Sequence, residues 1–178
     1  ETLSYDFSAL DGEVTGITLI MDNGTLGDGS SDWTIQFDNI RSCEGNEIVA
    51  CEGGELVNDF ETSDASIFNN FGGGVGTIED NTDTSVNSSA KIAQYVKNDG
   101  AVFGGITIAL DSNIVLNNTT FTIDVKSSSV WQLLFKLEGL NQQDILATSG
   151  TGWETLSYDF SALDGEVTGI TLIMDNGT

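Results

Sequence analysis

The side chains in this sequence that could do chemistry are mostly carboxylates. The chain has 28 Asp and Glu residues against 5 Lys and Arg, and it has no His. The missing His excludes Ser-His-Asp and Cys-His catalysis as well as His-ligated zinc. A glycosidase needs two carboxylates at a set separation, but among so many acids some pair always fits. The sequence therefore gives no reason to predict an enzyme.

Calcium is the ligand that this composition favours. Ca²⁺ takes about six to eight hard oxygen ligands, and acidic side chains without basic partners can supply them. Two acidic stretches are candidates: residues 79–83, and Asp22 together with Asp28 and Asp32. Neither has the ligand spacing of an EF-hand. The alternative is an acidic, solvated surface that aids solubility or suits a salty medium.

The charge of the whole chain limits its partners. The formal net charge is −23, yet hydrophobic residues make up 39% of the chain, so the composition is that of a globular protein. A field of this sign repels phosphate backbones, and we expect no nucleic-acid partner. No apolar run approaches the roughly 18 residues needed to span a bilayer, so we expect no membrane insertion.

An internal repeat determines how the chain is organised. Residues 1–25 and residues 154–178 have the same sequence, which sets a repeat period of 153 residues. A period of this length suits a whole domain. We interpret the chain as part of a tandem array of near-identical domains. A duplication introduced by engineering is the alternative.

The repeat predicts domain boundaries inside the chain. Residues 1–45 would be the C-terminal part of one repeat, 46–54 a linker, and 55–178 most of the next repeat without its last strand. Residues 1–42 could instead complete the sheet of 55–178 within the same chain. The Gly- and Glu-rich joint holds Cys43 and Cys51, which we expect to form a disulfide. Two free thiols in a reducing compartment are the alternative.

Alternating apolar and polar residues predict β-strands throughout. In 119–126, for example, Phe121, Ile123 and Val125 share one face. Asn-Gly and Asp-Gly pairs, such as Asp164-Gly165, separate the runs as tight turns do. No stretch has a sustained helical period. We predict an all-β, two-sheet antiparallel sandwich with strands at 32–39, 55–61, 75–79, 90–97, 103–110, 119–126, 131–138, 153–161 and 168–175.

The order of several short motifs points to a family. They are LVNDFE at 56–61, NNFGGG at 69–74, LLFKLEG at 133–139 and WETLSYDFSAL at 153–163, with LGDGSSDWTIQFDNI at 26–40 supplied by the other copy. This pattern resembles the β-jelly-roll modules of secreted bacterial glycan-degrading and cell-surface proteins, which are similar to carbohydrate-binding modules. The resemblance covers nearly a whole repeat and implies a secreted or cell-surface location.

The resemblance implies two kinds of site, and the residues themselves support a candidate for each. Such modules commonly hold a structural calcium near their first and last strands, and the matching residues are Glu61, Asp59 and Asp38. They also bind glycans through aromatic residues, for which Tyr95 and Trp153 are candidates. We expect Tyr95 to be exposed beside Lys91 and Lys97, and Trp153 to lie at a rim.

These features favour a structural role. We expect a non-catalytic repeat of an extracellular fibre, stalk or adhesin, whose partners are neighbouring copies of the same repeat. The alternative is a carbohydrate-binding module that binds polysaccharide through many copies. A row of exposed aromatic rings would favour the second function. We expect Trp33 and Trp131 to lie in the core instead.

Overall fold

The computed structural model describes residues 15–17, 26–44 and 54–175 of the chain. The described part is all-β, as predicted, and its helical pieces are single turns of 3-10 helix, η1 (Ser31–Trp33) and η2 (Ala65–Ile67). No helix among these residues is long and apolar enough to cross a membrane. The strands are β1 (Thr15–Ile17), β2 (Thr34–Glu44), β3 (Glu55–Asn58), β4 (Phe68–Phe71), β5 (Gly74–Asp80), β6 (Lys91–Lys97), β7 (Gly105–Ser127), β8 (Gln132–Gly139), β9 (Gln142–Ala147) and β10 (Gly152–Met174).

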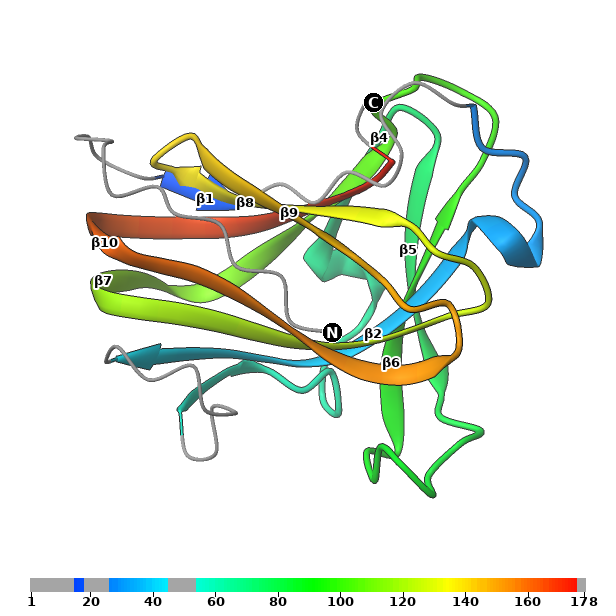
Figure 1. The fold of residues 1–178 in the computed structure, drawn as a ribbon, viewed down its shortest axis with the longest axis horizontal. Helices are drawn as coiled ribbons and strands as arrows, with labels where there is room; N and C mark the ends of the chain where they lie inside the picture. The colour runs from blue at the N-terminus through cyan, green and yellow to red at the C-terminus, as the bar shows by residue number, and fades with distance from the viewer. Residues whose placement is uncertain (1–14, 18–25, 45–53, 176–178) are drawn as a thin grey trace.

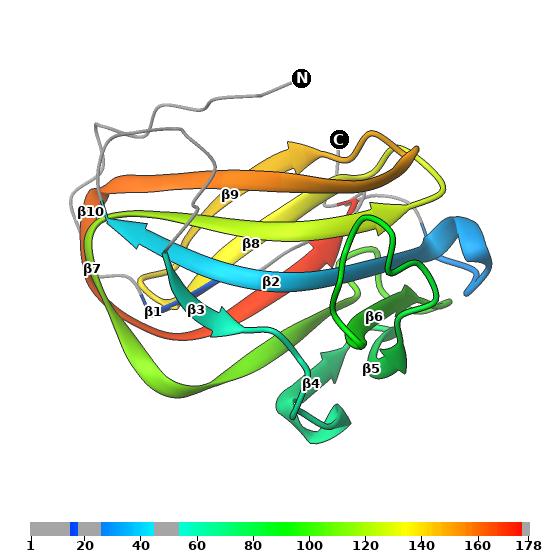
Figure 2. The ribbon, with the colours of Figure 1, turned by 90° about the horizontal axis from the view of Figure 1, so that it is seen from below.

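The strands form one curled sheet in the order β5-β6-β2-β7-β10-β1-β8-β9, with β3 beside β2 and β4 beside β7. All described pairs are antiparallel except β1 with β10. Strands β7 and β10 are each 23 residues long and pair along much of their length. Both bend sharply at the left of Figure 1, so the sheet curls around its own core (Figures 1 and 2). This arrangement is consistent with a β-sandwich.

Each of the two long strands joins two segments that the sequence predicts as separate strands. Residues 103–110 and 119–126 fall largely within β7, and residues 153–161 and 168–175 largely within β10. The pairing of β10 with β7 shifts register between Phe160 and Asp164, and Gly165 has a φ of 132°. Irregularities of this kind bend a strand without ending it. The predicted turn at Asp164-Gly165 is therefore a bend within a continuous strand.

The predicted alternation correctly identifies the core of the central strands. Phe135 of β8 stacks on Tyr158 of β10 with ring centroids 4.6 Å apart, and it lies 5.7 Å from Phe121 of β7. Such aromatic pairs contribute about 0.5–1.5 kcal/mol beyond the area they bury. The residues predicted to face inward from these strands are fully buried: Phe121, Ile123, Val125, Leu133, Phe135 and Leu137.

Two of the tryptophans pack on each other rather than deep in the core. Trp33 and Trp131 stack with ring centroids 4.4 Å apart, and both are half-buried. Trp131 packs against the core cluster. The expectation that both lie in the core therefore holds in part, because the pair covers one end of the core.

Strand β2 lies inside the sheet rather than beside it. It pairs with β6 on one side, with β7 on the other, and with β3 near its end. Residues 34–44 therefore complete the sheet of residues 55–174 within the same chain. Residues that precede position 45 in the sequence therefore pair with strands that follow position 53.

Candidate functional site

Asp38 is the best placed of the three predicted calcium ligands. It lies on β2 opposite Asp124 of β7 and is fully buried. The pairing of β2 with β7 shifts register between Asp38 and Arg41, and Asn39 has a φ of 48°. This bulge brings the Asn39 amide beside both carboxylates, with Nδ2 3.1 Å from Asp38 Oδ2 and 3.2 Å from Asp124 Oδ2. Two carboxylates thus share one amide donor.

One oxygen of Asp38 has no hydrogen-bond partner. Asn87 donates from Nδ2 to Asp38 Oδ2 at 2.8 Å, whereas Asp38 Oδ1 is buried and unpaired. Burial raises the pKa of Asp38, and the neighbouring Ser89 and Asn87 side chains offset part of that shift. An unpaired buried carboxylate oxygen is costly, because it has lost water without gaining a donor. It is also the kind of atom that a hard cation would satisfy.

The loop before β6 connects Asp38 with Glu61. Glu61 is exposed, and its Oε1 accepts from the backbone N of Ala90 at 2.6 Å. Asp59 Oδ1 accepts from the backbone N of Glu61 at 3.1 Å. Glu61 and Asp38 therefore contact opposite ends of the 87–90 segment. Among the described residues, however, no three Asp, Glu, Cys or His side chains are grouped closely enough to hold a metal ion.

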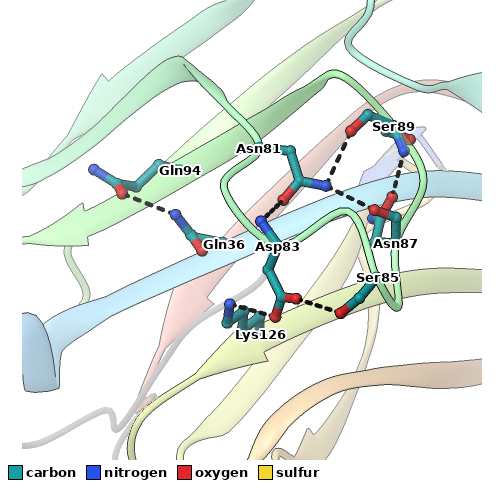
Figure 3. Close-up of polar contacts among 8 residues, drawn as sticks. All are labelled: Gln36, Asn81, Asp83, Ser85, Asn87, Ser89, Gln94 and Lys126. Carbon is teal, nitrogen blue, oxygen red and sulfur yellow. Dashed lines mark hydrogen bonds and ion pairs between the residues drawn. The ribbon is translucent and has the colours of Figure 1, made fainter.

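The same loop is ordered by its own polar side chains (Figure 3). Asn81 donates from Nδ2 to the carbonyls of Asn87 and Ser89, at 2.8 and 3.0 Å. Its Oδ1 accepts from the backbone N of Asp83 at 2.9 Å. The loop therefore holds Asn87 over Asp38.

The acidic stretch 79–83, a second calcium candidate, is used in ion pairs. Asp80 Oδ1 lies 2.5 Å from Lys91 Nζ, and Asp83 Oδ2 lies 2.9 Å from Lys126 Nζ. These lysines lower the pKa of both carboxyl groups. Surface ion pairs contribute little to stability, because water and salt screen them. The Asp83–Lys126 pair attaches the loop to β7, and the Asp80–Lys91 pair joins neighbouring residues of β5 and β6.

A groove of about 650 Å³ lies beside this loop, across β2, β6, β7 and the start of β10. Its lining includes Gln36, Gln94 and Lys126, together with Thr151 and Gly152. Figure 3 shows the two glutamine amides facing each other, with Gln36 Nε2 3.4 Å from Gln94 Oε1. Amide and ammonium groups that converge on a groove can bind hydroxyl-rich ligands.

Trp153 lies next to the groove, but its ring is not exposed there for a ligand to stack on. The side chain is half-buried, and its ring centroid lies 5.9 Å from Lys126 Nζ. Its Nε1 is buried without a hydrogen-bond partner. Phe103 is the one exposed aromatic side chain in the described ranges. The described surface thus has no row of exposed rings on which a sugar could stack.

The expected exposure of Tyr95 is wrong. Tyr95 is fully buried in the core cluster, and its hydroxyl donates to the carbonyl of Gly104 at 2.6 Å. Burial raises the pKa of Tyr95 well above its usual range. The lysines on the same face suggested a solvated side, but Lys97 is itself buried, and its Nζ donates to the carbonyls of Val102 and Met174. Tyr95 therefore cannot contact a ligand in this structure.

A second buried carboxylate lies away from the groove. Asp144 of β9 is 4% exposed, and its Oδ1 accepts from the backbone N of Ile145 at 2.7 Å. Burial, with a smaller effect from Asp159, raises the pKa of Asp144 to about 6. The sequence pattern did not single out this residue, because its neighbours in the fold come from distant segments.

The predicted disulfide between Cys43 and Cys51 stays a prediction, because Cys51 and the side chain of Cys43 lie outside the described residues. The same is true of the Asp22 candidate and of most of the linker at 46–54. The chain matches no family model, no curated protein and no solved structure. The resemblance to carbohydrate-binding modules therefore also stays a prediction.

Proposed function

We propose that this chain is a non-catalytic structural repeat of a secreted or cell-surface fibre, stalk or adhesin. The observation that carries the proposal is the match between the repeat and the sheet. Residues 26–178 span 153 residues, one full period, and their described strands, β2 to β10, belong to one curled sheet. Each period of the array would then supply one complete jelly-roll sandwich of two sheets. Neighbouring copies of the module are its partners.

Electron microscopy of the native material, paired with its intact mass, tests this function. We expect beaded filaments and a mass many times the 18.9 kDa of this chain. Identical interfaces that repeat along an axis produce such filaments. Discrete particles of a single module would contradict the proposal.

We further propose that a calcium ion stabilises the module at Asp38. The support is the unpaired, buried Asp38 Oδ1, with Asp124 opposite it and Glu61 on the adjoining loop. Calcium would supply the positive charge that this buried carboxylate lacks, and Asp38 would be the ligand from the sheet. Glu61 and Asp59 would hold it from the other side.

Thermal unfolding with calcium or with a chelator tests the calcium site. We expect calcium to raise the midpoint of the wild-type protein, because a ligand that binds only the folded state stabilises it. Asp38→Asn should abolish that response, whereas Asp80→Asn, which changes an exposed carboxylate by the same charge, should keep it. An unchanged response in Asp38→Asn would exclude this site.

Glycan binding in the groove of Gln36, Gln94 and Lys126 is the second candidate function. The converging amides favour it, and the lack of exposed aromatic rings on the described surface weighs against it. Affinity electrophoresis against a panel of soluble polysaccharides checks it. If the groove binds glycans, wild-type protein is retarded by at least one polysaccharide and the Gln36→Ala/Gln94→Ala double variant is not. Retardation of both proteins, or of neither, would exclude the groove.

A further inference from the structure

The duplicated segment fills a central position of the sheet in its second copy. Residues 154–174 lie in β10, which pairs with β7 through residues 152–167 and with β8 through residues 169–174. Tyr158, Leu172 and Met174 from this segment are fully buried. We call the position that β10 occupies between β7 and β8, where it also pairs with β1, the β7–β8 slot. A chain that lacked an occupant there would leave β7 without its pairing to residues 152–167 and β8 without its pairing to residues 169–174.

The first copy of the segment meets the same part of the sheet. Its described residues form β1, which pairs with β8. Gly16 and its duplicate Gly169 both register with Glu138, and Ile17 and its duplicate Ile170 both register with Leu137. Equivalent residues of the two copies therefore pair with the same two residues of β8. Both copies contain the residues that pair with β8 at the β7–β8 slot.

The β7–β8 slot ends at Met174. Lys97 connects this end to Gly29, which lies in the segment that follows the first copy in the sequence. Lys97 Nζ donates to the carbonyl of Met174 at 2.6 Å, and the carbonyl of Lys97 accepts from the backbone N of Gly29 at 3.2 Å. In the first copy, Asp22 corresponds to Asp175 and precedes Gly29 by seven residues. Seven residues can span up to about 23 Å. Either copy can therefore fill the slot and connect to the rest of the sheet.

We propose that the two copies are interchangeable occupants of the β7–β8 slot, and that the surplus copy in one chain can fill the slot of a second copy of this chain. The exchange breaks and reforms the same contacts, because the two segments are identical in sequence. Its balance then depends on the connecting links and on local concentration rather than on new contacts. The role of this exchange in joining modules rests on the proposed structural repeat.

Paired substitutions at equivalent positions test the exchange within one chain. Tyr158→Ala removes a buried ring that stacks on Phe135 and whose hydroxyl donates to the carbonyl of Leu133. Tyr5→Ala is the equivalent change in the first copy. Each single variant should keep its thermal midpoint within about 3 °C, because the intact copy takes the slot, whereas the double variant should lose about 10 °C. Phe135→Ala, which has no duplicate, should lose as much on its own.

Two results would overturn the exchange within a chain. If Tyr158→Ala alone falls as far as the double variant, the first copy does not replace the second. If the double variant does not fall at all, the slot does not depend on this ring. Neither result bears on whether native material forms filaments, so the structural repeat can survive the failure of this inference.

Mixing variants tests exchange between chains. The Tyr5→Ala/Tyr158→Ala protein has a slot and no intact occupant, whereas wild-type protein has one intact segment more than its own slot needs. Native mass spectrometry of the mixture should show a one-to-one complex. The Tyr5→Ala single variant, whose one intact segment fills its own slot, should form none. Complexes with both donors, or with neither, would contradict exchange between chains.

Discussion

At the scale of single residues, this protein is defined by carboxylates that the fold buries. Asp38 and Asp144 are both nearly or fully buried, and burial raises the pKa of each. Asp38 accepts hydrogen bonds from the side-chain amides of Asn39 and Asn87, whereas Asp144 accepts one from the backbone N of Ile145. A chain with a net charge of −23 therefore carries part of that charge where it lowers stability.

Asp144 makes stability fall as pH rises. Its pKa is raised from 3.8 to about 6, so its favourable contribution is complete below pH 3.8 and is lost as pH rises through about 6. A shift of this size corresponds to about 3 kcal/mol. Asp144→Asn should therefore raise the free energy of unfolding at pH 7.5 by about 1–3 kcal/mol and change it little at pH 3.5. Urea unfolding at the two pH values measures both.

The control for that change is Asp111→Asn, which removes the same charge from an exposed position. It should leave stability within about 0.5 kcal/mol at both pH values. An equal gain in both variants would mean that net charge, and not burial of Asp144, is responsible.

At the scale of strands, the fold depends on a close backbone contact between the first residues of β5 and β7. Gly74 begins β5, and a Cβ placed there would lie 2.4 Å from the carbonyl O and 2.6 Å from the backbone N of Gly105, which begins β7. Neither atom can move without moving its strand. The glycine-rich stretch at 72–74 is thus a packing requirement of the sheet.

Gly74→Ala should destabilise the protein by about 2 kcal/mol or more, because the added methyl group forces two strands apart. Its neighbour Val75 is 39% exposed, so Val75→Ala should cost about 0.5 kcal/mol or less. Chemical denaturation of both variants measures the difference. If the two variants unfold together, the close contact between β5 and β7 does not limit stability.

Local patterns in the sequence predict the strands and much of the core, but not the polar groups that the fold brings together. Alternation correctly places Phe121 and Phe135 inward, because each lies on a strand with one apolar face. It misplaces Tyr95, because the neighbouring Lys97 is satisfied by carbonyls that lie far away in sequence. The partners of Asp38 come from residues 49 and 86 positions away, which no local pattern reveals.

At the scale of the whole molecule, the one-signed charge opposes the compact fold. Only 5 basic residues offset 28 acidic ones, so the carboxylates within one folded molecule repel one another at low ionic strength. The screening length falls from about 30 Å at 0.01 M salt to about 3 Å at 1 M. We therefore expect the thermal midpoint in a chelator-containing buffer to rise steadily as NaCl increases from 0.02 to 0.5 M. A midpoint that stays constant or falls would show that self-repulsion is unimportant here.

We propose that one repeat period of 153 residues makes one complete module, wherever along the array the period begins. The windows 1–153 and 26–178 contain the same residues in circularly permuted order. The most direct test is amide hydrogen exchange on these two proteins. We predict that both protect the same amides in β2, β6 and β7, because either copy of the duplicated segment completes the sheet. An unprotected 1–153 beside a protected 26–178 would contradict the claim.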